Sequence, residues 1–100
     1  MIFLLETNVQ MVAHCTKIAY KEVDLPVQPG IGMMISFVQC ELDVTFIDIK
    51  INPTNNSIVQ VVVHVQDSRL KIYQEGGEDA KDIAKHCHDH LVNSLGFSER

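Results

Sequence analysis

Between residues 33 and 65, apolar and polar side chains alternate in short runs, which is typical of β-strands that have one buried face. The strongest run is residues 58–65, in which Val59, Val61, Val63 and Val65 share one face. The opposite face is half apolar, and the run contains no Asp, Glu, Lys, Arg or Pro. Because such a run would be prone to aggregate at a sheet edge, we predict that it forms a central strand.

Other segments have strand character, and turn-rich segments separate them. The segments with strand character are residues 9–20, 33–38, 44–51 and 69–73. Residues 9–20 have apolar side chains on both period-2 faces, which fits one long or bent strand. Residues 24–32 contain two prolines and two glycines, which predict an extended connection. Residues 52–57, Asn-Pro-Thr-Asn-Asn-Ser, lie between two strand-like runs and predict a hairpin turn.

The last quarter of the chain changes to a helical period. Acidic residues at positions 78, 79 and 82 favour a helix N-terminus there, because they complement its positive dipole end. Gly96 followed by Phe97 predicts a left-handed C-terminal cap whose next residue folds back onto the last turn. The apolar stripe that should face the sheet consists of Ala80, Ile83, Ala84, Cys87, Leu91, Ser94 and Leu95.

These elements predict an α+β fold over a single domain, residues 1–100: an antiparallel, curled sheet of about five strands followed by one C-terminal amphipathic helix packed on one face. One helix can cover only one face of such a sheet. Either the sheet curls on itself or another chain covers the second face. In the second case, the expected interface of a homodimer or higher oligomer consists of Ile58, Gln60, Val62 and His64.

Composition narrows the classes of partner and compartment. The formal charge is −5, from 13 acidic and 8 basic residues, and no basic cluster is interleaved with aromatic residues, so we expect no nucleic-acid partner. Cys15, Cys40 and Cys87 form no paired motif and read as buried thiols in a reducing compartment. No signal-like or bilayer-length apolar run is present, so we expect a cytoplasmic protein without a membrane partner.

The sequence His86-Cys87-His88-Asp89-His90 contains the residue types of a metal site. On a helix, however, these side chains point in different directions: His86 and His90 share one flank with Asp82, Cys87 faces the sheet, and His88 and Asp89 point elsewhere. A zinc site needs three or four ligands, and the third would have to come from another element, from His14 or His64. We therefore expect the two flank histidines to be solvated.

No nucleophile elbow, Cys–His signature or phosphate-binding glycine loop is present, so we predict no catalytic residues and no cofactor. The leading hypothesis is a small non-catalytic protein-binding module, such as a stoichiometric inhibitor, an immunity-type protein or an adaptor, which also self-associates. The alternative is a small-molecule or metal-binding protein, or an enzyme, with its site near His86, His90 and Asp82 on the helix shoulder.

Overall fold

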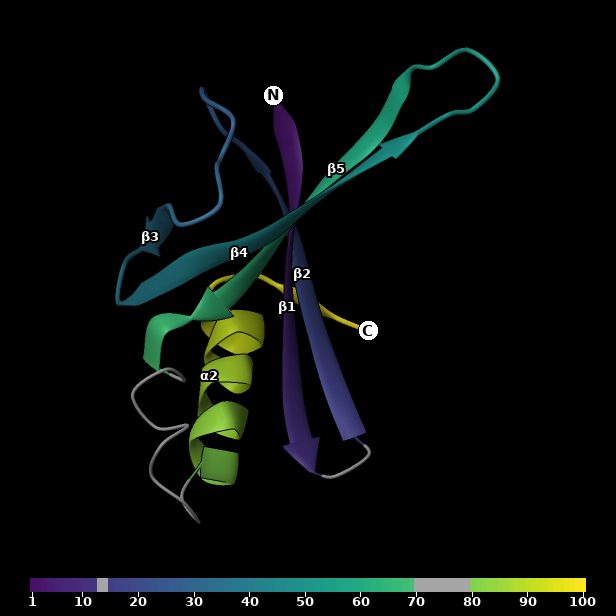
Figure 1. Cartoon of the computed structure of the whole chain (residues 1–100). Coiled ribbons are helices and arrows are strands. Elements are labelled where there is room, and N and C mark those ends of the chain that lie inside the picture. The colour runs from purple at the N-terminus through teal and green to yellow at the C-terminus, as the bar shows by residue number, and fades with distance from the viewer. Residues whose placement is uncertain (13–14, 70–79) are drawn as a thin grey trace.

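In the part of the chain that the structure describes, the strands and the C-terminal helix are arranged as Figure 1 shows. The computed structural model describes residues 1–12, 15–69 and 80–100. The elements are β1 (Ile2–Val12), β2 (Cys15–Asp24), β3 (Met34–Phe37), β4 (Cys40–Ile51), β5 (Ile58–Asp67), α2 (Ala80–Ser94) and β6 (Ser98–Glu99).

The strands form one sheet in the order β3-β4-β5-β1-β2-β6. Neighbouring strands are antiparallel except at the centre, where β1 and β5 run parallel and Leu4 pairs with Val62. The sheet is strongly curled, because β4 and β5 cross β1 and β2 at a steep angle (Figure 1). The predicted α+β class is confirmed, and so is the central position of the valine-rich strand, β5.

The first third of the chain contains a chain reversal instead of one strand over residues 9–20. β1 ends at Val12, β2 begins at Cys15, and the two strands pair along their whole length. The prediction was wrong because both strands have period-2 patterns, and the segment between them lacks the Gly, Pro or Asn residues that usually mark a turn. The predicted strand over residues 69–73 is also wrong at its first residue, since Arg69 has helical backbone; residues 70–73 lie outside the described residues.

Both turn-rich segments form the predicted connections. The Asn52 amide donates to the carbonyl of Ser57 (2.8 Å), and Asn56 has a φ of 58°, which closes the β4–β5 hairpin. β4 begins at Cys40, four residues earlier than the alternation indicated, and bulges near Thr45. β2 and β3 are joined by the predicted extended connection, in which Gly32 has a φ of 89°.

Helix α2 packs on β1 and β2, and Ala84, Cys87 and Leu91 of the predicted stripe are buried, whereas Ser94 is exposed. The amide of Phe97 donates to the carbonyl of Leu91 (3.0 Å) and Gly96 has a φ of 76°, so the predicted C-terminal cap is confirmed. Lys21 of β2 donates to the carbonyl of Leu95 (2.6 Å), which fixes the end of the helix on the sheet. The core lies between this helix and one sheet face and includes Phe3, Leu5, Ala19, Leu42, Val44, Val63, Val65, Leu91 and Phe97.

Candidate functional site

A buried carboxylate, Asp67, joins three elements at the end of β5. Its side chain is only 2% exposed, and Arg69 binds both of its oxygens, with Nη2 at 2.6 Å from Oδ2 and Nε at 3.0 Å from Oδ1. The backbone amide of Arg69 also donates to Oδ1 (3.0 Å). The thiol of Cys40, at the start of β4, donates to Oδ2 (3.5 Å), and Cys87 of α2 lies near enough for the Asp67 charge to act on its thiol. We call these four residues the Asp67 cluster.

The electrostatics of the Asp67 cluster oppose nucleophilic chemistry by its thiols. Burial, and then the charge of Asp67, raise the pKa of both Cys40 and Cys87 to about 11. Burial would also raise the pKa of the Asp67 carboxyl, but the hydrogen bonds and charge of Arg69 outweigh it and lower that pKa. At neutral pH both thiols are therefore protonated and the carboxylate is charged and paired, so the cluster ties β4, β5 and α2 together.

An open pocket of about 330 Å³ lies beside the Asp67 cluster. Its wall includes the partly exposed face of Arg69, but the guanidinium is already engaged by Asp67. The remaining lining side chains in the described part of the chain are Ser36, Phe37, Gln39, Cys40, Glu41 and Ser68. The Ser68 hydroxyl donates to the carbonyl of Glu41 (2.9 Å) and lies 3.5 Å from Oδ2 of Asp43, and Arg69 is the one cation among these lining residues, so they include no histidine base and no convergent set of anion donors.

Sequence reasoning missed the Asp67 cluster, although one signal was present. Asp67 continues the period-2 face of Val63 and Val65, which is the buried face of β5. A carboxylate on a buried face requires a cation nearby, and Arg69 two residues later is the nearest one in the sequence.

The candidate metal ligands on α2 do not converge. His86 and Asp82 are exposed, and His90 is half-buried. Residues 1–12, 15–69 and 80–100 contain no group of three His, Cys, Asp or Glu side chains placed to hold a metal ion. His64 is on β5, where its ring packs on Phe46 with centroids 5.5 Å apart; His14 lies outside the described residues.

His88 is the buried histidine of the helix, contrary to the prediction that it points away from the core. Its side chain is 0% exposed, and its Nε2 lies 3.4 Å from Oε2 of Glu99 on β6. Interaction with His88, and then the charge of Lys17, lower the pKa of Glu99. The prediction failed because β6, which follows the helix, covers the flank of α2 that carries His88. A strand of two residues has no periodic pattern from which it could be predicted.

Replacing both flank histidines, His86→Ala with His90→Ala, is expected to change the free energy of unfolding by less than about 1 kcal/mol. The reason is that His86 is exposed and that neither side chain has a hydrogen-bond partner among the described residues; His90 departs from the expected solvation, since it is half-buried and its Nε2 is buried. Urea titration followed by circular dichroism measures the change. A metal role would instead show as near-stoichiometric zinc in the purified protein that the double variant lacks.

The predicted interface residues occupy different environments. Ile58 is 64% exposed, Gln60 and His64 are half-buried, and Val62 is only 3% exposed within the single chain. The curl of the sheet and neighbouring side chains already cover Val62. A Val62→Glu substitution would therefore disturb the folded monomer itself, and the surface available to a partner lies closer to the hairpin turn.

That surface is on the β4–β5 hairpin, which projects beyond the rest of the sheet (Figure 1). The pairing of β5 with β1 begins at Val62, so residues 48–61 form a two-stranded ribbon, which we call the arm. The apolar face of the arm continues the buried sheet face past the end of the helix-covered core. Its exposed side chains are Ile49, Ile51 and Ile58, and Val59 is exposed beside them.

The chain matches no known family of protein domains, no curated protein and no solved structure. Among the described residues, no helix has the length and apolar character needed to cross a membrane.

Proposed function

We propose that this chain is a non-catalytic protein-binding module that also associates with itself, and that the arm is its contact surface. The supporting observation is the exposure of apolar side chains at the end of a thin projection: 45% for Ile49, 54% for Ile51 and 64% for Ile58. A two-stranded ribbon is marginally stable alone in water, and an exposed apolar patch is typical of a contact site. A partner chain that covers the arm would stabilise the ribbon and remove its exposed apolar side chains from water.

An inhibitor, an immunity-type protein and an adaptor all act by occupying a surface, so none of them needs a reactive group. The protonated thiols and paired charges of the Asp67 cluster fit this role, because they hold the fold together without offering a nucleophile. The net charge of −5 favours a partner that places basic residues around the apolar contact.

The test compares a variant of the arm with a matched variant elsewhere. Ile58→Glu places a charge on the exposed face of the arm, whereas Val27→Glu places the same charge at an equally exposed apolar position in the β2–β3 connection. We expect Ile58→Glu to abolish co-purification of a protein at near-equal stoichiometry, including an untagged copy of the chain itself. Val27→Glu should leave it unchanged, and both variants should keep the wild-type thermal midpoint within a few degrees.

Two results would contradict the proposal. In the first, the two variants retain the same partners in the same amounts. In the second, the purified wild-type protein carries a tightly bound small molecule in place of a protein. Quantitative mass spectrometry of tagged chains isolated from the native cell distinguishes these results.

A further inference from the structure

The outer edge of β4 is unpaired along the arm. β3 pairs with β4 only as far as Asp43, and the backbone of Val44 then bonds Gly32 and Met33, each at 2.9 Å. From residue 45 to the hairpin turn, no described residue pairs with this edge. An open strand edge offers a row of N–H and C=O groups to another strand.

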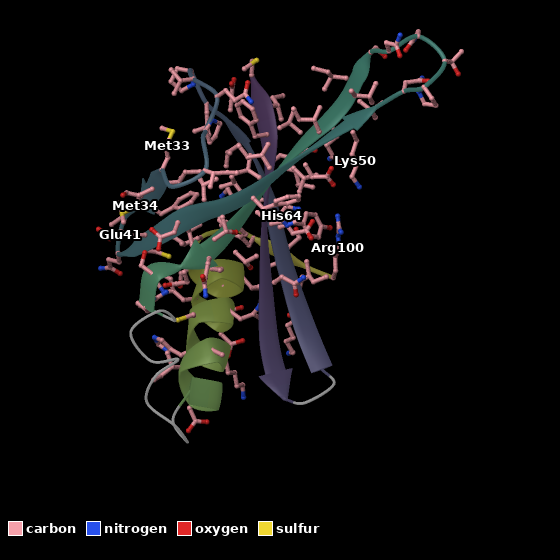
Figure 2. All side chains as sticks on the ribbon, viewed as in Figure 1. Met33, Met34, Glu41, Lys50, His64 and Arg100 are labelled. Carbon is pink, nitrogen blue, oxygen red and sulfur yellow. The ribbon has the colours of Figure 1, made fainter. Side chains whose placement is uncertain are left out.

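The backbone groups that face outward can be identified by alternation. The amide of Asn52 points inward, since it donates to Ser57 of the hairpin. Successive residues of a strand direct their backbone groups to opposite sides, so those of Ile51, Ile49 and Ile47 point outward. The side chains of these three isoleucines share the apolar face of the arm, and Asp48 and Lys50 lie on the opposite face (Figure 2 shows Lys50).

We infer that the arm binds a second copy of this chain by antiparallel pairing of the two β4 edges, with the two-fold axis at Ile49. This inference rests on the proposed function and specifies its self-association. In this register Ile49 faces Ile49 of the other copy, and Ile47 faces Ile51. Each such pair exchanges two backbone hydrogen bonds, because all three residues direct their N–H and C=O groups outward.

Charge selects this register over its neighbours. With the axis at Ile49, Asp48 of each copy lies directly opposite Lys50 of the other, which forms two cross-strand pairs of opposite charge. An axis at Asp48 or at Lys50 would place like charges face to face, which is destabilising. An axis at Ile51 would bring Pro53 into the ladder, where it has no N–H to donate, and an axis at Ile47 would run the ladder into the occupied edge at Val44.

The same pairing also addresses the exposed isoleucines. It places the apolar faces of the two arms side by side in one four-stranded ribbon, so Ile47, Ile49 and Ile51 of β4 each gain an apolar neighbour from the other copy. Three or more strands with a common apolar face are stable where an isolated hairpin is marginal. One contact therefore pairs the open edge of β4, places Asp48 opposite Lys50 and brings the apolar faces of the two arms together.

Charge reversal tests the register. Asp48→Lys and Lys50→Asp, each alone, replace both attractive pairs by repulsive ones and are expected to weaken the dimer about tenfold or more in sedimentation velocity experiments. The double variant Asp48→Lys with Lys50→Asp restores opposite charges and should dimerise like the wild type. An equimolar mixture of the two single variants should also form a dimer, because each copy then supplies the charge that its partner needs.

Ile49→Pro provides a second variant that blocks the edge directly. It removes an outward N–H without removing a hydrogen bond to β5, so the monomer should keep its circular dichroism spectrum and lose dimerisation. A wild-type chain that stays monomeric at high micromolar concentration would overturn the inference, as would single charge variants that dimerise normally. If Ile58→Glu abolished binding to a different protein while the charge variants had no effect, the inference would fail and the proposed function would stand.

Discussion

Cys87→Asp is expected to lower the free energy of unfolding by about 4 kcal/mol at pH 7, which is a large part of the roughly 5–15 kcal/mol that stabilises a domain of this size. Cys87 is 1% exposed and lies beside Asp67, so the new carboxylate would be buried next to a charge of the same sign. Arg69 already binds both carboxylate oxygens of Asp67, so it cannot neutralise a second carboxylate. Urea titration at pH 7 measures the loss.

Two controls separate this effect from ordinary changes in the helix. His86→Asp introduces the same side chain one residue earlier at an exposed position and should cost less than about 1 kcal/mol. Cys87→Ser removes the thiol without adding charge and should cost less than Cys87→Asp. The burial itself would be disproved if the native Cys87 thiol reacted with a labelling reagent as fast as it does in the unfolded chain.

Arg69→Met should lower the free energy of unfolding by about 3 kcal/mol at pH 7, because it leaves the buried Asp67 carboxylate without its partner. Arg69 is itself 31% exposed, so water reaching the site reduces the loss relative to a fully buried pair. The double variant Asp67→Asn with Arg69→Met removes both charges and is expected to recover part of the stability.

The loss caused by Arg69→Met should depend on pH. In the wild type the pKa of Asp67 is lowered, so its stabilisation is present above the ordinary carboxyl pKa of about 3.9 and is lost as the pH falls through the folded value. Without Arg69, burial raises the folded pKa above the unfolded one, and protonation then favours the folded state. The difference between the two proteins should therefore shrink from pH 7 to pH 4. Equal differences at both values would show that the ion pair is not its source.

The parts of the fold that could be predicted from sequence are those with a long periodic pattern or a specific terminator. The hairpin at residues 52–57 and the end of α2 at Gly96 both carry turn residues whose geometry the structure retains. The central position of β5 could be predicted because one of its faces is apolar, the other is half apolar, and residues 58–65 contain no charged residue or proline. The β1–β2 reversal carries no such marker, and a parallel pair between β1 and β5 depends on contacts that are remote in sequence.

The exposed apolar face of the arm was harder to predict, because it depends on where the core ends. The sequence places Val59 and Val63 on the same face of one strand, yet Val63 is buried and Val59 is 67% exposed. Two features separate them: the β4–β5 register shifts at Val59, which is left without a partner between the pairs Lys50–Gln60 and Ile51–Ile58, and the β1 pairing stops at Val62. Likewise, Ile49 and Ile51 are exposed because the β4–β5 hairpin extends past the neighbouring strands, and no local sequence pattern indicates how far it extends.

The parallel pair between β1 and β5 has a consequence for how the chain folds. On one side of it lies the β1–β2 hairpin, and on the other lies the β3–β4–β5 meander, and each of these can form from contacts between consecutive segments. The pair itself joins Leu4 to Val62 and must close a loop that contains most of both units. Because loop closure of that length slows folding, we expect the two halves to form first and their union at β1 and β5 to limit the folding rate. Until then, the facing edges of β1 and β5 stay open, and a nascent chain can exchange halves with another copy at this point.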